Sequence, residues 1–190
     1  MVAWMFGKVK EITSKMDCMA EEDVLLKLQL TFNEMLHWDD IAKNLNMVIS
    51  EEGIISQYDG YFDLKELDWD AYREKYGNIY RMDRLLKAEG KSADDYKVAK
   101  QADTLMTFFN LEKEEVDEIL EKMGYQLPED YLTKNLKYYL TRTSHGSSLS
   151  RVVHAQLANI IDDDQLSWEL YEDALGSDYV DIQGGTTGEG

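Results

Sequence analysis

Cysteine is almost absent from this chain, because Cys18 is the only one among its 190 residues. A single cysteine can form neither an internal disulfide nor a cluster of thiolate metal ligands, and it fits the reducing cytoplasm, where we expect the protein to act. Histidine is also scarce. The three histidines, His37, His145 and His154, share no metal-ligand spacing, so we expect no metal site.

Basic residues are few relative to acidic ones. The chain has 20 lysines and arginines against 38 aspartates and glutamates, and its formal net charge is −18 at pH 7. This balance disfavours nucleic acids and anionic membrane surfaces, which attract basic proteins, so we expect neither as a partner. Because the overall charge repels anions, a bound phosphate would have to be held by local groups.

Proline is nearly absent as well, since Pro128 is the only one. Few prolines permit long helices, and apolar residues recur at spacings of three and four residues along most of the chain. Residues 47–67 differ, because apolar β-branched residues flank a glycine there and predict extended pieces around a tight turn. We therefore expect an all-α fold without a repeat or an internal boundary. The predicted helices are 2–17, 21–45, 68–76, 79–88, 93–110, 112–123, the stretch from Pro128 to about 140, 147–160 and 164–176.

Hydroxyl side chains are concentrated in the run Thr141–Ser150, around Gly146 and immediately before an apolar helical pattern. Backbone N–H groups, hydroxyl donors and the positive end of a helix dipole together make an anion site, for which phosphate is the natural occupant. The alternative is a simple helix N-cap, formed by Ser147 or Ser144, which requires only one of these residues.

Three other groups of residues could contribute to a site. Residues 181–190 contain glycines and threonines like a phosphate-binding loop without its lysine, and the alternative is a flexible terminal tail. Lys100 and Asp103 lie three residues apart in the predicted helix 93–110, where a solvent-exposed ion pair is the ordinary explanation. Four aromatic residues could stack on sugar rings or pack in the interior; they are Tyr58, Tyr61, Phe62 and Trp69.

Five segments, taken in order, form a recognisable series. They are Gly60–Leu64, Tyr80–Gly90, Lys100–Asp103, Arg142–Ser150 and Asp181–Gly190. Each segment alone is a weak signal, but the series resembles the phosphorylases of glycoside hydrolase family 65, which act on maltose, trehalose, trehalose 6-phosphate, kojibiose and nigerose. The resemblance spans nearly the whole chain, and it implies a partial (α/α)6 barrel, which is a segment of a helical toroid.

The resemblance also implies a reaction. In these phosphorylases an α-linked glucoside and inorganic phosphate give β-glucose 1-phosphate with inversion, and no other cofactor is needed. A glutamic acid protonates the leaving oxygen while phosphate attacks the anomeric carbon from the opposite face, where an inverting hydrolase uses water. The protein must orient the phosphate and offset its charge.

The roles of family residues can be transferred where the motifs match. Lys100 and Gln101 would contact the glucose that is transferred. The phosphate would be bound by His145, Ser147 and Ser148 together with Gly185, Thr186 and Thr187. The resemblance thus implies a disaccharide and phosphate as the molecules that the protein binds.

The chain departs from the family pattern, and the absence of the acid motif is the most important difference. The chain has no Gly-Pro-Asp-Glu-Tyr-like motif, which carries the catalytic glutamate, so we expect the general acid to lie outside this chain. Residues 1–190 would then form one segment of the catalytic domain, incomplete at both ends and inactive by itself. Helix faces left unpaired in a partial ring predict an exposed hydrophobic patch or a homo-oligomer.

Two other interpretations belong to different classes of protein. The first is an acidic helical module that binds a partner without catalysis. The second is a hydrolase of similar toroidal fold, in which water attacks and a second carboxylate replaces the hydroxyl groups. The series of motifs favours the phosphorylase, because a scaffold has no need to keep His145–Ser148 and Gly185–Thr187 together.

Overall fold

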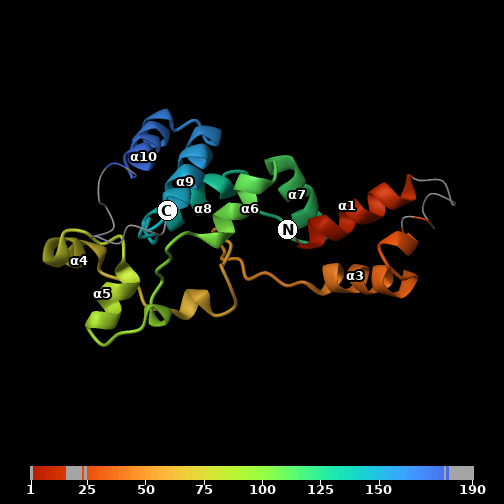
Figure 1. Ribbon diagram of the computed structural model, residues 1–190, viewed down its shortest axis with the longest axis horizontal. Coiled ribbons are helices and arrows are strands. Elements are labelled where there is room, and N and C mark those ends of the chain that lie inside the picture. The colour runs from red at the N-terminus through yellow and green to blue at the C-terminus, as the bar shows by residue number, and fades with distance from the viewer. Residues whose placement is uncertain (1, 16–22, 24, 178, 180–190) are drawn as a thin grey trace. The chain divides into compact units, whose positions relative to one another are not determined.

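The computed structural model describes residues 2–15, 23, 25–177 and 179. This part of the chain consists of helices joined by extended segments, which meet in isolated bridges and form no strand (Figure 1). The all-α class predicted from the sequence is therefore confirmed. The elements are α1 Val2–Ser14, α3 Phe32–Asn44, η1 Tyr61–Asp63, α4 Trp69–Tyr76, α5 Met82–Ala88, η2 Ala93–Asp95, α6 Asp103–Asn110, α7 Lys113–Lys122, α8 Tyr131–Leu140, α9 Ser148–Ile160 and α10 Asp164–Gly176.

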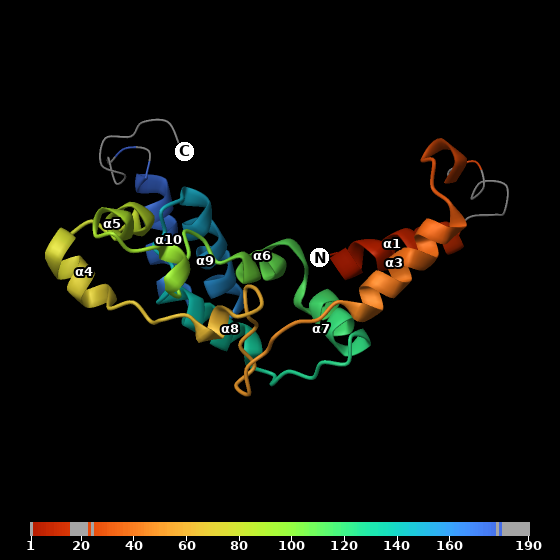
Figure 2. The same ribbon diagram turned by 90° about the horizontal axis from the view of Figure 1, so that it is seen from below.

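The chain forms two compact units, of which the first comprises Met1–Asn46 and Lys113–Gln126. Within it α1 and α3 lie side by side (Figure 2). The Lys8 ammonium is 3.8 Å from the Glu115 carboxylate and so links α1 to α7. The prediction of one continuous barrel segment over residues 1–190 stays a prediction.

Apolar side chains of the first unit are exposed along both α1 and α3. They include Met5, Ile12, Leu36 and Ile41, each at least 41% exposed. Such faces are what a partial ring of helices is expected to leave without a partner helix. Self-association through them stays a prediction.

The predicted helix 21–45 is wrong as a single element. The chain leaves the helical conformation before α3, and Gln29 adopts a positive φ of 56°. Thr31 then starts α3 with a capping box, in which its hydroxyl accepts from the Glu34 N–H at 3.2 Å and the Glu34 carboxylate accepts from the Thr31 N–H at 2.8 Å. This reciprocal pair satisfies two end groups at once and makes a new helix start favourable here.

The predicted helix 93–110 is also wrong in its first half. Ser92 does cap a helix, but only the three-residue η2. The chain then stays outside the helical conformation as far as Ala102, because it pairs with distant segments in bridges that join Lys65 to Tyr96 and Ala99 to Thr143. Since α6 begins at Asp103, Lys100 and Gln101 lie before the helix rather than in it.

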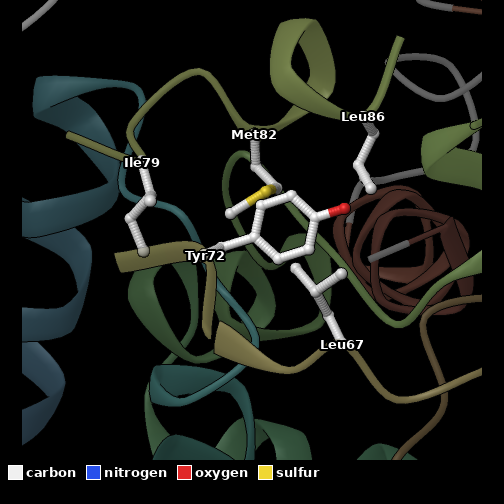
Figure 3. Packing of buried hydrophobic residues seen from close by; sticks show 5 residues of the cluster. All are labelled: Leu67, Tyr72, Ile79, Met82 and Leu86. Carbon is white, nitrogen blue, oxygen red and sulfur yellow. The ribbon is translucent and has the colours of Figure 1, made fainter. Parts of the chain in front are cut away.

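The second unit comprises Met47–Glu112 and Leu127–Gly190. One of its cores lies between α4 and α5, where five apolar side chains converge (Figure 3). They are Leu67, Tyr72, Ile79, Met82 and Leu86. Gly77 follows the last residue of α4 with a positive φ of 68°, which glycine adopts readily, and the helix ends where the predicted range 68–76 ends. This core supports the segment around Tyr80, which forms one wall of the site.

A second core lies around α9, which packs against α6, α8 and α10 (Figure 1). Its buried face includes Val153, Leu157 and Ala158, each no more than 2% exposed. Of the four aromatic residues that could stack on sugar rings, Tyr61 is a packing residue, because it is 1% exposed and its ring centre lies 5.9 Å from that of Tyr139 on α8. Phe62 and Trp69 are half-buried, and Tyr58 is exposed.

Candidate functional site

The loop that precedes α9 is held against the segment that precedes α6. The Ala99 N–H donates to the carbonyl of Arg142 at 3.0 Å, and the Ser144 N–H donates to the carbonyl of Ala99 at 2.8 Å. This parallel bridge places Lys100 and Gln101 beside the hydroxyl-rich loop. Lys100 is exposed and Gln101 is half-buried, so both residues predicted to contact glucose lie next to the predicted phosphate loop.

Gly146 is the point at which three segments meet. A Cβ atom at this position would lie 2.4 Å from the carbonyl oxygen of Tyr80 and 3.4 Å from Cγ of Lys100. Real Cβ atoms do not approach backbone atoms this closely, so the contact admits only glycine. Gly146 therefore joins the Tyr80 segment, the Lys100 segment and the start of α9 into one site.

The N-terminus of α9 lies directly after Gly146 in the chain. Ser147 is the N-cap residue, but its side chain makes no capping hydrogen bond, and Ser148 is the first helical residue. Both serines are half-buried. A simple N-cap therefore does not explain the hydroxyl of Ser147. Two hydroxyl groups thus lie at the positive end of a helix dipole, which is favourable for an anion.

His145 is held in an unusual conformation. Its φ is 51°, in the left-handed region that costs energy for residues other than glycine and is often found at functional sites. The Nδ1 atom lies 3.1 Å from the hydroxyl oxygen of Ser150, and the ring packs edge-to-face with His154 at 4.7 Å. Burial, then the neighbouring His154 and Arg151, lower the pKa of His145 to about 3. At neutral pH the ring is therefore uncharged and offers one N–H donor.

His154 lies behind this ring and is fully buried. Its Nδ1 atom is 2.7 Å from the carbonyl oxygen of Ser150. Because a carbonyl can only accept, Nδ1 carries the proton of the neutral ring. Burial lowers the pKa of His154, and its hydrogen bond to Ser150 opposes this shift in part.

Acid should destabilise the protein through His145. In the unfolded chain this residue binds a proton near pH 6.5, whereas in the folded chain it does so only near pH 3. The unfolded state thus binds more protons in this range, so stability is lost as the pH falls from about 6.5, by up to about 1.4 kcal/mol per pH unit. Urea unfolding at several pH values measures this slope. The His145→Asn variant, which tolerates a positive φ and does not titrate, should have a shallower slope, and equal slopes would contradict the prediction.

A hollow of about 490 Å³ opens beside the loop. This volume is within the ordinary range for small-molecule sites. Its lining brings the chain around Tyr80 together with the loop before α9. The lining residues are Arg73, Gly77, Asn78, Ile79, Tyr80, Thr143, Ser144 and His145.

The structure brings together five of the eight predicted site residues, which are Lys100, Gln101, His145, Ser147 and Ser148. The other three, Gly185, Thr186 and Thr187, lie outside the described residues. Their role in binding phosphate stays a prediction.

Sequence analysis missed three residues that support His145. Ser150, Arg151 and His154 lie on the buried face of α9, and each is no more than 2% exposed. The periodicity of α9 could have indicated these residues. They are polar or charged, yet they occupy positions that should be apolar in a helix packed on one face.

Within the described part of the chain, no group of three histidine, cysteine, aspartate or glutamate residues is placed to hold a metal ion. In the same part, no helix is long and apolar enough to cross a membrane.

Comparisons with known proteins agree with the geometry. The chain is 51% identical over 150 residues to the trehalose 6-phosphate phosphorylase of Lactococcus lactis. The aligned residues cover 79% of this chain and 20% of that protein. The chain is also 28% identical over 158 residues to the kojibiose phosphorylase of Thermoanaerobacter brockii. The aligned residues cover 83% of this chain and 18% of that protein. The chain thus spans about a fifth of the length of these curated relatives.

A solved structure from the human microbiome, assigned by name to the kojibiose phosphorylases, has the same fold with a TM-score of 0.65 and 22% sequence identity. The match covers 93% of this chain and 24% of that one, and it confirms the partial (α/α)6 barrel. The family model for the glycosyl hydrolase family 65 central catalytic domain matches residues 1–190. The chain therefore belongs to glycosyl hydrolase family 65, as part of its central catalytic domain.

Proposed function

We propose that this chain carries the phosphate-binding part of a disaccharide phosphorylase that releases β-glucose 1-phosphate with inversion. The observation that carries the proposal is the meeting point at Gly146. There the start of α9, the Lys100 segment and the Tyr80 carbonyl are in contact. Membership of the family and the disaccharide phosphorylases among its relatives support the same reaction.

Each site residue has a role in this proposal. Neutral His145 donates one N–H to the phosphate, and the hydroxyl groups of Ser147 and Ser148 donate at the positive end of α9. Gly185, Thr186 and Thr187 complete the phosphate site. Lys100 and Gln101 contact the glucose, which places its anomeric carbon next to the nucleophile.

The reaction needs two events at the glycosidic bond. A phosphate oxygen forms a bond to the anomeric carbon, and the bond from that carbon to the leaving oxygen breaks as a glutamic acid protonates this oxygen. In our proposal that glutamic acid lies outside this chain. Phosphate is already an anionic nucleophile, so the site has to bind and orient it and needs no strong base.

For the substrate, we propose an α-linked disaccharide of the trehalose type, with trehalose 6-phosphate as the first choice. The support is the 51% identity to the trehalose 6-phosphate phosphorylase, against 28% to the kojibiose phosphorylase. The products would be β-glucose 1-phosphate and glucose 6-phosphate.

Phosphate binding by the 190-residue chain tests the site directly. Titration calorimetry with inorganic phosphate should show binding, and Ser147→Ala should weaken it about tenfold, because a hydrogen bond to a charged group is lost. Disaccharide binding should change less. The matched control is Ser167→Ala on α10, which should bind phosphate like the unmodified chain. Equal losses for phosphate and disaccharide, or no loss for phosphate, would contradict the role of Ser147.

A measurement of turnover by the 190-residue chain tests our proposal that the general acid lies outside it. The chain is offered phosphate with trehalose 6-phosphate, trehalose, kojibiose, nigerose or maltose, and release of β-glucose 1-phosphate is measured. We expect phosphate binding without product. Product from any of these sugars would identify the substrate and would show that a working acid is present within the chain or its oligomer.

A further inference from the structure

Arg151 is a buried cation without a counter-ion among the described residues. Its side chain is 2% exposed, and neither terminal guanidinium nitrogen has a hydrogen-bond partner there. The guanidinium lies 4.7 Å from the centre of the Tyr80 ring, so the face of an aromatic ring compensates part of its charge.

Arg142 offers an internal comparison. It also lies over a tyrosine, with its guanidinium 3.8 Å from the centre of the Tyr138 ring. Unlike Arg151, it is bound by a carboxylate, because its Nη2 is 3.0 Å from Glu66. The two arginines therefore differ in the feature that matters here, which is whether an acidic group neutralises the buried charge.

An uncompensated buried charge is costly, since neither water nor a counter-ion stabilises it. The same low-polarity surroundings let its field extend further than that of an exposed lysine. A buried cation of this kind lowers the stability of the folded protein unless a nearby anion compensates its charge. The overall charge of −18 makes such a local source of positive potential more important for an anion site.

The field of Arg151 reaches the candidate site. Arg151 lies in the first turn of α9, just after Ser147 and Ser148, and it packs on Tyr80, which lines the hollow together with His145. Its charge also contributes to the lowered pKa of His145, after burial and His154. Both histidines there are uncharged at neutral pH, so Arg151 adds a permanent and buried positive charge beside the loop.

We propose that Arg151 is a positioning residue for the anion site, whose buried charge has no counter-ion among the described residues and is compensated by bound phosphate. The guanidinium acts from behind Tyr80 and makes no contact with the phosphate. It raises the affinity of the loop for the anion and lowers the stability of the anion-free protein. This inference rests on the proposed function and adds a residue that the family motifs did not assign.

The test compares two properties of Arg151→Met, which keeps an apolar stem and removes the charge. Phosphate affinity of the 190-residue chain is measured by titration calorimetry, and the midpoint of thermal unfolding is measured without phosphate. We expect the dissociation constant for phosphate to rise about tenfold. We expect the unfolding midpoint to stay the same or to rise, because the buried charge is gone. Arg151→Lys should keep most of the affinity.

The matched control is Lys91→Met, which removes a cation that lies over the Tyr72 ring and is already paired with Glu89 at 2.7 Å. It should leave phosphate affinity within about twofold and lower the unfolding midpoint, because it breaks the ion pair with Glu89 and the hydrogen bond to Tyr72. Arg151→Met should therefore lower phosphate affinity without lowering the unfolding midpoint, whereas the control should lower the midpoint without changing affinity.

Each other outcome has a definite meaning. If Arg151→Met lowers the unfolding midpoint and affinity together, and Arg151→Lys does the same, Arg151 is structural and the inference is wrong. If Arg151→Met binds phosphate normally while Ser147→Ala does not, the inference is wrong and the proposed phosphate site stands. If the unmodified chain binds no phosphate, the proposed site and the inference both fail.

Discussion

Gly146→Ala is expected to lower the free energy of unfolding by about 2–3 kcal/mol and to reduce phosphate affinity at least tenfold. The new methyl group would lie 2.4 Å from the Tyr80 carbonyl, which is a backbone atom and cannot rotate away. Relief of this clash has to separate the loop from the Tyr80 segment. The loss should therefore appear in both stability and phosphate binding, measured by urea unfolding and titration calorimetry.

The control for this substitution is Gly176→Ala at the end of α10. A Cβ atom there would meet no atom within 4 Å, and alanine is the better helix former. This variant should be as stable as the unmodified protein or slightly more so, with normal phosphate binding. If Gly146→Ala behaved in the same way, the close contact with Tyr80 would not be important for the site.

Asn135→Ala is expected to lower the free energy of unfolding by about 3–4 kcal/mol, although Asn135 lies outside the site. Asn135 is fully buried and makes three hydrogen bonds. Its side-chain oxygen accepts from the Ile55 N–H at 2.9 Å, and its Nδ2 donates to the carbonyls of Gly53 and Tyr131, both at 2.8 Å. Alanine would remove the side-chain partner of the buried Ile55 N–H and of the Gly53 carbonyl and would open a cavity.

Asn110→Ala is the matched control, because Asn110 is exposed and its amide bonds only the carbonyl of Met106 in its own helix. Asn110→Ala should lower the free energy of unfolding by less than about 1 kcal/mol, since water replaces the hydrogen bond. Urea unfolding of both variants measures the difference. Similar losses for the two would mean that Asn135 does not hold the extended segment at Gly53–Ile55 to α8.

Helix ends were predictable where the sequence carries a local signal. The glycine after Tyr76 ends α4, Gly124 follows the end of α7, and Pro128 precedes α8, so these boundaries agree with expectation to within a few residues. Such signals act through φ angles and backbone donors, which depend on the residue itself. The same holds for the turn at Gly53, whose positive φ of 86° allows the bridge from Ile49 to Ile55.

Long helices were predicted wrongly where a local pattern competed with other interactions. Residues 93–110 have helical periodicity, but the segment from Tyr96 to Ala102 is not helical, because Tyr96 and Ala99 pair with residues far away in sequence. Around Thr31 the competing interaction was local, because the capping box with Glu34 outweighs continuity of the apolar pattern. Periodicity alone contains neither the distant partner nor the balance between two local alternatives.

The all-α class, the family and the hydroxyl loop at the start of α9 can be predicted from the sequence, because they depend on residue types in a fixed order. The contact of Lys100 with Gly146 depends on the folded chain, through the bridge between Ala99 and Thr143. The burial of the Arg151 charge and the neutral state of His145 also arise only on folding. The physical reason is that desolvation and the proximity of charges arise when distant segments pack, whereas neighbouring residues in the chain do not specify them.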